Sequence, residues 1–363
     1  MKKKSLHVTM HYFPIFGGQE VYIDSLSKIL LDQGYENKYI QPFRGKEHED
    51  ILFTPPGRFF HRFIPGFDWF WFNLNVLLSR SFLKKQSLIF CNYFFHYSML
   101  PKDVRTIVIS HGVDWTTKSK DVFNKYKKSV ARSKLRTNDI LVANCSEILR
   151  YRGLNVQAGE SLHTEVANNV FFIPNCIDNS KFRDLGLKRK KNILVPRNIR
   201  RSRGVTLAIE AFNISSASKE GYKLIIAGGP LEGRYYEECI ELVDKYQLNE
   251  RVEFVGNISQ DELLSYYNRS LISVVPTLEM EGTSLSALES MSCGCPVVAT
   301  YVGGLKDIDC VHSDVNPESL ADKIDLLIED VDAESARQKD VILNAHTIEH
   351  WKKSWKSVVD RIS

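Results

Sequence analysis

The sequence has no uninterrupted apolar run long enough to cross a membrane as a helix. The nearest approach, IPGFDWFWFNLNVLL at residues 64–78, contains Asp68, Asn73 and Asn75, which are costly inside a bilayer. The opening MKKKSLHVTM places a basic run before apolar residues, but histidine interrupts the apolar stretch and no small-residue cleavage site follows. A signal peptide needs both features. We therefore expect a first β-strand there, and nothing that spans a membrane.

Cysteine is sparse and follows no metal-binding pattern. The seven cysteines are odd in number and scattered, mostly inside apolar runs: Cys91, Cys145, Cys176, Cys239, Cys293, Cys295 and Cys310. Cys293 and Cys295 stand too close together, and too far from other ligands, for a metal site. This usage indicates reduced thiols in a cytoplasmic protein.

Charge is nearly balanced over the chain but not within it. The formal net charge is +4, yet residues 1–172 hold 24 Lys and Arg against 15 Asp and Glu, while the remainder holds 24 against 29. The first half therefore favours an anionic partner. A length of 363 residues exceeds what one hydrophobic core usually supports, so two domains are expected.

Short β-branched runs alternate with helical patterns in two successive series. In the first half, LHVTM, SLIFCN, RTIVIS and DILVAN are typical of buried parallel strands. The second half repeats the alternation from KNILVP to PVVAT. Two such series predict an α/β protein of two doubly wound domains, joined near FFIPNCIDNSKF, where Pro174 and Asn175 break the pattern. Ligands of this fold class bind beyond the carboxyl ends of the strands.

The stretch EGTSLSALE, residues 281–289, holds two carboxylates eight positions apart. It follows a buried strand that ends near Pro276, and a helix is expected to open between Thr283 and Ser286. The start of a helix presents unpaired backbone N–H groups and attracts anions. The two acids would then address different parts of one ligand, although a capping acid and a solvated helix acid give the same pattern.

Basic residues and glycines follow other predicted strands. Arg197, Arg200, Arg201 and Arg203 come after one strand and before a helix, and guanidinium groups suit phosphate. Glycine turns in AGGPLEG and YVGG follow two further strands and allow a backbone to approach closely.

These segments resemble the retaining glycosyltransferases of the GT-B fold, specifically glycosyltransferase family 4. FPIFGGQEVYIDSLSKILLDQGYE resembles that family's opening glycine loop and first helix, FIPNCIDNSKF its interdomain segment, PRNIRRSRGVTLAIEAF its basic segment, and residues 279–304 its nucleotide-sugar signature. The resemblance implies two facing Rossmann-like domains with parallel sheets. Residues 1–172 would bind the acceptor, 173–345 the nucleotide sugar, and a helix in 346–363 would cross back to the first domain.

The resemblance also implies a role for individual residues. Glu281 and His111 would lie beside the donor sugar at the transfer centre, and Glu289 would hold the ribose hydroxyls. Val255 and Gly256 would lie near the base. The donor diphosphate would be held by Arg197, Arg203, Gly17, Gly18, Thr283, Ser284 and Leu285.

The implied activity is transfer of a sugar, with retention, from a UDP- or GDP-sugar to a glycan or lipid-linked acceptor of a cell envelope. The nucleotide sugar is the substrate, and neither a metal nor another cofactor is expected. The alternatives are a GT-B sugar-nucleotide epimerase and a non-catalytic sugar-nucleotide-binding protein. Nucleic acid is not an expected partner, because no RNA-binding motif is present.

The sequence departs from the family pattern at several positions. Thr283 and Ser284 stand where Phe and Gly are frequent, so contacts to the donor sugar are expected to differ. The spacing from Arg197 to Arg203 is one residue longer than the commonest form, which leaves Arg201 as a rival for the second diphosphate contact. After GGLKD, which ends at the matching acid Asp307, a strand and loop are shortened.

Two segments of the first half have open interpretations. Residues 53–75 contain nine Phe and Trp, which fits an acceptor pocket, a lipid-facing patch or a buried loop and helix equally. Residues 116–136 carry eight basic residues and one acid, as in a solvated helix or a face that meets anionic membrane. The expected location is therefore the cytoplasm, and the more specific alternative is the inner face of the membrane.

Two short motifs are weak metal signals. HTIEH, residues 346–350, has the letters of an inverted zinc-protease motif, and DVD at residues 330–332 resembles a metal-binding acid pair. The first runs into Trp351 and Trp355 of the expected terminal helix, and the second closes a helix far from EGTSLSALE. Neither is expected to bind a metal.

Overall fold

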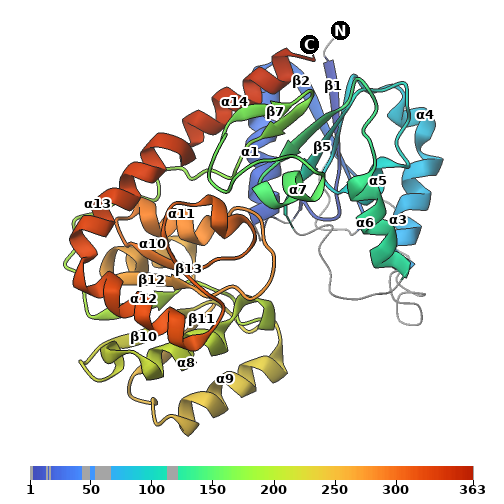
Figure 1. The fold of residues 1–363 in the computed structure, drawn as a ribbon. Helices are drawn as coiled ribbons and strands as arrows, with labels where there is room; N and C mark the ends of the chain where they lie inside the picture. Colours follow the sequence, from blue (N-terminus) through green and yellow to red (C-terminus); the bar gives the residue numbers. More distant parts are fainter. Residues whose placement is uncertain are drawn as a thin grey trace. The chain divides into compact units, whose positions relative to one another are not determined.

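The computed structural model describes residues 3–13, 15, 18–42, 50–53, 67–112 and 122–362. The chain forms two compact units (Figure 1). The first unit consists of Met1–Pro174 with Trp351–Ser363, and the second unit is Asn175–His350. The terminal helix therefore begins in the second unit and continues in the first.

The described residues of the first unit contain an eight-stranded sheet in the order β3-β2-β1-β4-β5-β6-β8-β7. The strands are β1 (Lys3–Val8), β2 (Tyr35–Gln41), β3 (Ile51–Phe53), β4 (Leu88–Cys91), β5 (Thr106–Ser110), β6 (Ile140–Ala143), β7 (Thr164–Ala167) and β8 (Val170–Phe172). All neighbours pair in parallel except β7 and β8, which form an antiparallel hairpin. Chain order reverses between β1 and β4, which is where a ligand crevice is expected in such a sheet.

Helices accompany this sheet in the alternating order of a doubly wound domain. They are α1 (Gly18–Asp32), α3 (Phe67–Leu78), α4 (Arg80–Leu83), α5 (Phe94–Tyr97), α6 (Val122–Arg132), α7 (Ser146–Tyr151) and α14 (Ile348–Asp360). Trp351 and Trp355 attach α14 to α1, because both rings meet Tyr22 edge-on and Trp355 Nε1 donates a hydrogen bond to the Tyr22 hydroxyl at 3.1 Å. Both tryptophans are fully buried.

The second unit contains a six-stranded parallel sheet in the order β11-β10-β9-β12-β13-β14. Its strands are β9 (Asn192–Val195), β10 (Lys223–Ala227), β11 (Val252–Gly256), β12 (Ile272–Val275), β13 (Val297–Thr300) and β14 (Val311–Ser313). Its helices are η1 (Arg201–Arg203), α8 (Val205–Ile214), η2 (Ser216–Ser218), α9 (Gly233–Lys245), α10 (Gln260–Arg269), α11 (Leu285–Ser292), η3 (Gly303–Asp307), α12 (Pro317–Glu329), α13 (Val331–Val341) and η4 (Ile342–His346).

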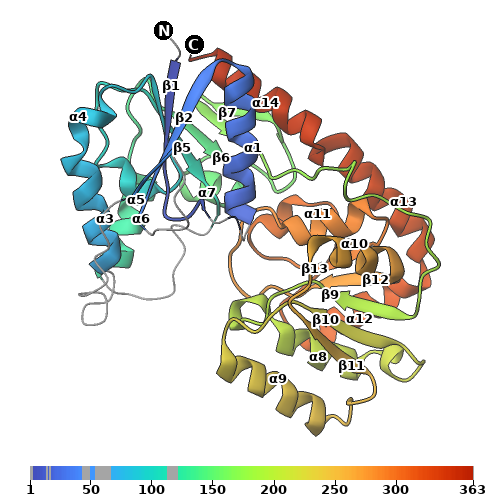
Figure 2. The ribbon, with the colours of Figure 1, turned by 180° about the vertical axis from the view of Figure 1, so that it is seen from behind.

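Side chains of this sheet are buried on both faces, as its uninterrupted apolar strands require. Ile193 and Val195 of β9 join the core formed with α8, α9 and α12. Leu194, between them, points to the opposite core, formed with α10 and α11. The helices cover both faces of the sheet (Figure 2), so the loops beyond the strand ends are the parts left to meet a ligand.

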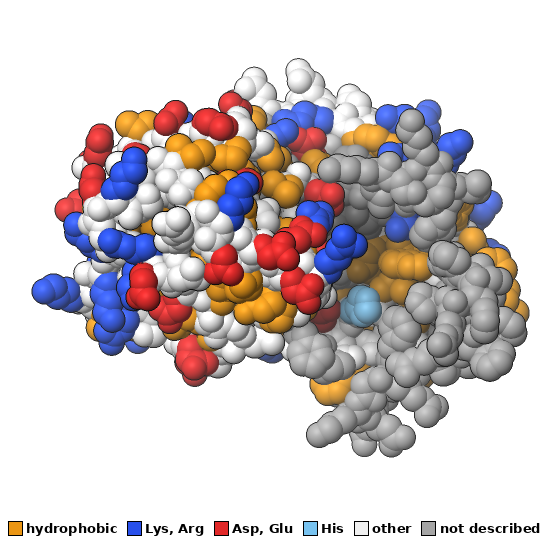
Figure 3. Space-filling model, turned by 90° about the horizontal axis from the view of Figure 1, so that it is seen from below, with side chains coloured by type: hydrophobic (Ala, Val, Ile, Leu, Met, Phe, Trp, Pro, Cys, Tyr) orange, Lys and Arg blue, Asp and Glu red, His pale blue; other side chains and the backbone are white. Residues whose placement is uncertain are grey.

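On the face of the second unit seen in Figure 3, charged side chains of both signs are interspersed.

The expected parallel strands are confirmed in both units, and with them the fold class. The prediction for SLIFCN, RTIVIS and DILVAN corresponds to β4, β5 and β6, and the helix expected after Glu281 is α11. The β7–β8 hairpin was not predicted, because β7 is short, half polar and partly exposed. Among the described residues, no helix is both long enough and apolar enough to cross a membrane.

Candidate functional site

The candidate site of the second unit lies where chain order reverses between β9 and β12. The loop after β9 carries Arg197, and the loop after β12 carries Thr277 and Glu281. Because parallel strands bring their carboxyl ends to one edge of the sheet, these two loops meet. Arg203 comes from η1, directly before α8.

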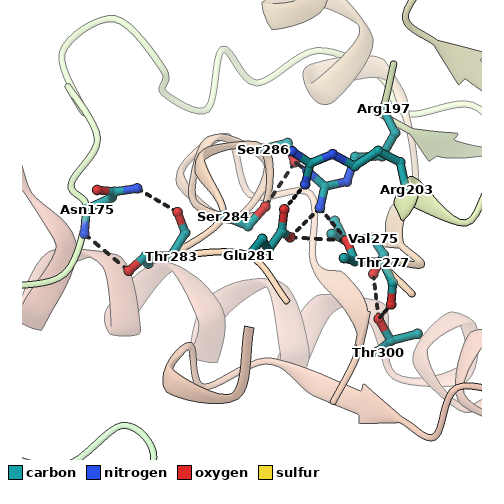
Figure 4. A network of polar contacts seen from close by, with 10 residues as sticks. All are labelled: Asn175, Arg197, Arg203, Val275, Thr277, Glu281, Thr283, Ser284, Ser286 and Thr300. Carbon is teal, nitrogen blue, oxygen red and sulfur yellow. Dashed lines mark hydrogen bonds and ion pairs between the residues drawn. The ribbon is translucent and has the colours of Figure 1, made fainter. Parts of the chain in front are cut away.

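Glu281 is the centre of a buried network of polar contacts (Figure 4). Its carboxylate forms ion pairs with the guanidinium groups of both Arg197 and Arg203. The Thr277 hydroxyl donates to the same carboxylate at 3.1 Å and accepts a hydrogen bond from Arg197. Glu281 and Arg197 are buried, while about a third of the Arg203 side chain is exposed. The site thus holds two positive charges against one negative charge.

The ionisation of this network follows from its charges. Burial disfavours the carboxylate of Glu281, but the charges of Arg197 and Arg203 outweigh burial and keep its pKa below the ordinary value. Burial lowers the pKa of Arg197, an effect that Glu281 opposes. The Nε atom of Arg197 is buried and has no hydrogen-bond partner among the described residues. The Arg197 guanidinium is therefore desolvated and has one donor unused.

The start of α11 is held next to this network. Ser286, in its first turn, accepts a hydrogen bond from Arg197 at 3.2 Å, and its hydroxyl lies 3.2 Å from that of Ser284. Asn175 fixes Thr283 from the other side: its amide nitrogen donates to the Thr283 carbonyl at 2.7 Å and its backbone N–H to the Thr283 hydroxyl at 3.3 Å. Leu285 is the first residue of the helix. The predicted residues 283–285 therefore lie beside the arginine pair.

Two glycines let the η3 turn approach the backbone of Glu281. A Cβ atom on Gly303 would lie 2.6 Å from the Glu281 carbonyl oxygen, and one on Gly304 would lie 2.4 Å from the carbonyl carbon of Gly282. The Gly304 N–H also donates to the Glu281 carbonyl at 2.8 Å. The YVGG turn therefore acts on the site by supporting the Glu281 loop from behind.

Glu289 lies about one turn into α11, in a different environment. Its carboxylate accepts a hydrogen bond from the Tyr267 hydroxyl at 2.9 Å. Burial raises the pKa of Glu289 to about 7, although Tyr267 and more distant cations act in the opposite direction. The two acids of EGTSLSALE thus differ in charge state. Glu281 is ionised at pH 7, whereas the raised pKa of Glu289 leaves its carboxyl only partly ionised at that pH.

A pocket of about 240 Å³ opens beside the arginines. Its lining includes Arg197, Asn198, Arg203, Gly228, Asn257 and Ile258. Val255 and Gly256, the predicted base region, end β11 immediately before Asn257 and Ile258. Gly228 is required here, because a Cβ atom would lie 2.3 Å from the Arg197 carbonyl oxygen. Arg197 therefore lines the pocket and also contacts the start of α11 through its hydrogen bond to Ser286.

The other two arginines of the basic segment point elsewhere. Arg200 pairs with Glu232 at 3.1 Å, and Arg201 pairs with Glu238 while lying over the Tyr235 ring. All four charges are substantially exposed. The structure therefore places Arg203, and not its rival Arg201, in the Glu281 network.

His111 belongs to the first unit, where it directly follows β5. Its Nε2 atom lies 3.2 Å from Asn92 Oδ1, and its ring meets Tyr22 edge-on with centroids 5.1 Å apart. Burial lowers the pKa of His111 to about 3, so the imidazole is neutral at physiological pH. Gly18 is the first residue of α1. Gly17 lies outside the described residues.

Sequence reasoning missed three residues that build the site. Thr277 bridges Arg197 and Glu281, Asn175 fixes Thr283, and Tyr267 binds Glu289. Asn175 and Tyr267 come from segments distant in sequence, so no local spacing marks them. Within the described part of the chain, no cluster of three or more His, Cys, Asp or Glu side chains could hold a metal ion.

Comparison with known structures identifies the fold class. The chain superposes on sucrose-phosphate synthase from Thermosynechococcus elongatus with a TM-score of 0.75 and 18% identity, covering 99% of both chains. It superposes on Anabaena Alr3699/HepE in complex with UDP and glucose with a TM-score of 0.73 and 14% identity, covering 99% of this chain and 100% of the other. The chain therefore has the GT-B fold of glycosyltransferases.

Sequence comparison finds a family model that matches most of the second unit. The model described as "Glycosyl transferases group 1" matches residues 177–345, which contain the whole Glu281 network. Residues 177–345, just under half of the chain, are therefore similar to this family.

Two curated relatives each match less than half of the chain. A D-inositol 3-phosphate glycosyltransferase of Mycolicibacterium smegmatis is 30% identical over 149 residues, which is 40% of this chain and 28% of that protein. The phosphatidylinositol N-acetylglucosaminyltransferase gpi3 subunit of Schizosaccharomyces pombe is 30% identical over 169 residues, 44% of this chain and 36% of that protein. The match thus spans about a third of the length of these relatives.

Proposed function

We propose that this protein transfers a sugar from a nucleotide sugar to an acceptor with retention of anomeric configuration. The observation that carries the proposal is the convergence of Arg197, Arg203 and Glu281 at the reversal point of a glycosyl transferases group 1 domain. Two guanidinium groups exceed the charge of one carboxylate, so the site has capacity for a further anion. A nucleoside diphosphate is such an anion.

The chemistry of transfer fits this charge distribution. Cleavage of the bond between the anomeric carbon and phosphate leaves positive charge on the sugar and negative charge on the diphosphate. Arg197, Arg203 and the start of α11 would stabilise the diphosphate as its charge develops. Retaining glycosidases use two carboxylates at one bond, but here the second acid, Glu289, is proposed to hold ribose. We therefore assign no carboxylate of the described site as a covalent nucleophile. A diphosphate oxygen would take the proton of the acceptor.

The remaining predicted residues complete the proposed donor site. Ionised Glu289 would accept hydrogen bonds from the ribose hydroxyls, and the base would lie towards Val255 and Gly256. Backbone groups of residues 283–285 and of Gly17 and Gly18 would contact the donor phosphates. Glu281 would lie beside the donor sugar together with neutral His111.

The donor is proposed to be a UDP- or GDP-sugar, and the solved complex of Alr3699/HepE with UDP and glucose supports the former. The acceptor is proposed to be a glycan or a lipid-linked molecule of the cell envelope. The names of the two curated relatives, which specify inositol phosphate and phosphatidylinositol, favour a polar acceptor that carries phosphate. The proposed location is the cytoplasm, with the inner face of the membrane as the alternative.

A donor-binding experiment tests the assignment of the arginines. Calorimetric titration with a panel of UDP- and GDP-sugars should find one that binds, and Arg203→Met should weaken it by about 10- to 100-fold, because a charge-assisted hydrogen bond is lost. Arg200→Met is the matched control, since Arg200 follows the same strand but pairs with Glu232. Equal loss in both variants, or binding by none of the panel, would contradict the proposal.

A further inference from the structure

Both histidines of HTIEH, residues 346–350, bond to other groups of the protein. His346 is buried, and its Nδ1 atom lies 3.3 Å from the backbone carbonyl oxygen of Asn175. Because a carbonyl oxygen can only accept, Nδ1 of His346 carries a proton and donates it. His350 Nδ1 lies 2.8 Å from the Thr347 hydroxyl. The motif therefore joins the end of the second unit to Asn175 at its beginning.

An unusual turn of the backbone presents His346. The residue ends η4, a π-helix of five residues, and a π turn between α-helices often marks a functional position. Ile342, at the start of η4, is buried in the same core as Leu288 and Met291 of α11. The turn thus packs against the helix whose first residues lie beside the arginine pair.

Backbone hydrogen bonds hold the segment after Asn175 against the same turn. The Ile177 N–H donates to the His346 carbonyl at 2.8 Å, and the Ile348 N–H donates to the Ile177 carbonyl at 3.0 Å. Ile177 and Thr347 therefore pair as a short parallel bridge. Together with the His346 imidazole, these bonds determine where the backbone of Asn175 lies.

Asn175 in turn sets the direction of the peptide between Thr283 and Ser284. Its Nδ2 atom donates to the Thr283 carbonyl at 2.7 Å, and Figure 4 shows Asn175 and the arginine pair on opposite sides of Thr283. The Thr283 carbonyl and the Ser284 N–H belong to one planar trans peptide, so they point in opposite directions. The Ser284 N–H thus points away from Asn175.

The Ser284 N–H is a donor without a protein acceptor. Ser284 is buried, and its N–H makes no hydrogen bond within the described part of the chain. Buried N–H groups are normally paired. The Ser284 hydroxyl lies 3.2 Å from that of Ser286, which accepts from Arg197. This N–H is therefore available to the ligand that the arginines bind.

We propose that His346 is a positioning residue for the donor diphosphate, because through Asn175 it directs the Ser284 N–H at the β-phosphate. This role rests on the proposed function, in which the sugar on the β-phosphate lies beside Glu281 and the ribose beside Glu289. Ser284 stands three residues after Glu281 and five before Glu289, so its N–H meets the β-phosphate. The hydrogen bond strengthens as negative charge develops there during cleavage.

Binding of nucleoside mono- and diphosphates tests the proposal with the full chain. Calorimetric titrations with UMP, UDP, GMP and GDP give the ratio of the two Kd values for the base that the wild type binds, and this ratio isolates the contribution of the β-phosphate. Asn175→Ala releases the Thr283 carbonyl and should lower the preference for the diphosphate about tenfold, because a hydrogen bond to a charged group is lost. Affinity for the monophosphate should stay within about twofold.

Substitutions of His346 separate positioning from packing. His346→Phe keeps a ring in the same space and His346→Leu keeps a smaller apolar group, but neither can donate. Both should lower the diphosphate preference about three- to tenfold. His346→Asn has an N–H donor at the same number of bonds from the backbone as Nδ1 and should restore the preference. Circular dichroism should show that each variant is folded.

The matched control is Asn268→Ala. Asn268 is buried, and its amide donates to the carbonyls of Arg183 and Leu264 at 3.1 and 3.0 Å. It lies before the amino end of β12, whereas Ser284 lies beyond the carboxyl end, so the control should keep the wild-type preference.

Three results would overturn the positioning role and leave the proposed function standing. They are an unchanged preference in Asn175→Ala or in both donor-free His346 variants, an equal loss in Asn268→Ala, and a loss in His346→Asn as large as in His346→Phe. Failure of the wild type to bind both UDP and GDP would overturn the positioning role and the proposed function together.

Discussion

Nucleotide binding should be coupled to ionisation of Glu289. Without a ligand the pKa of this carboxyl is raised to about 7 by burial, whereas ribose hydroxyls need an ionised carboxylate as acceptor. Binding should therefore release about half a proton at pH 7, and affinity should fall about tenfold, or about 1.4 kcal/mol, from pH 8 to pH 6. Calorimetry in buffers of different ionisation enthalpy measures both quantities, with a nucleotide sugar as the probe because its diphosphate does not titrate in this range.

The same carboxyl should leave a mark on the stability of the ligand-free protein. Because the folded pKa of Glu289 lies above its ordinary value of 4.5, its contribution is fully present below about pH 4.5 and is lost as pH rises through about 7. The loss amounts to about 3 kcal/mol. In Glu289→Gln this part of the pH profile should be absent, and nucleotide affinity should no longer change with pH. A wild-type affinity that is constant from about pH 6 to pH 8, with equal heats in all buffers, would refute the reasoning.

Four further substitutions have different expected effects on the free energy of unfolding, measured by denaturant titration. Glu281→Gln should lower it by about 3 kcal/mol because buried Arg197 loses its counter-charge, whereas Glu232→Gln in an exposed ion pair should change it by less than about 1 kcal/mol; equal effects would contradict the burial argument. Gly303→Ala should lower it by more than about 1 kcal/mol because its Cβ atom would collide with the Glu281 backbone. His7→Phe should raise the free energy of unfolding by about 1 kcal/mol. Both ring nitrogens of His7 are buried without partners among the described residues, whereas a phenyl ring has no polar atom that loses hydration on burial. A decrease in the free energy of unfolding would show that the nitrogens have hydrogen-bond partners.

Periodicity and turn residues predict the architecture of this chain because they are local signals. Buried parallel strands read as continuous apolar runs, and β4, β5 and β6 appear where those runs stand. The start of α11 was also predictable, since small polar residues precede an apolar helical pattern. The β7–β8 hairpin was not, because β7 is short and partly exposed and has no continuous apolar run.

The candidate site could be predicted only in part. Arg197, Arg203 and Glu281 were each singled out, but their direct contact depends on the meeting of two loops some eighty residues apart, which no local spacing encodes. The choice between Arg201 and Arg203 likewise depends on where η1 points each side chain. The difference in charge state between the two acids comes from their neighbours, two arginines for Glu281 and a tyrosine for Glu289.

Turnover with an acceptor tests the central claim most directly. The protein should release one nucleoside diphosphate for each sugar joined to a cell-envelope acceptor, with the anomeric configuration of the donor retained in the product. Glu281→Ala should lower this rate by at least about a hundredfold. A full rate in that variant, isomerisation of the donor sugar without an acceptor, or donor binding without any turnover would contradict the assignment.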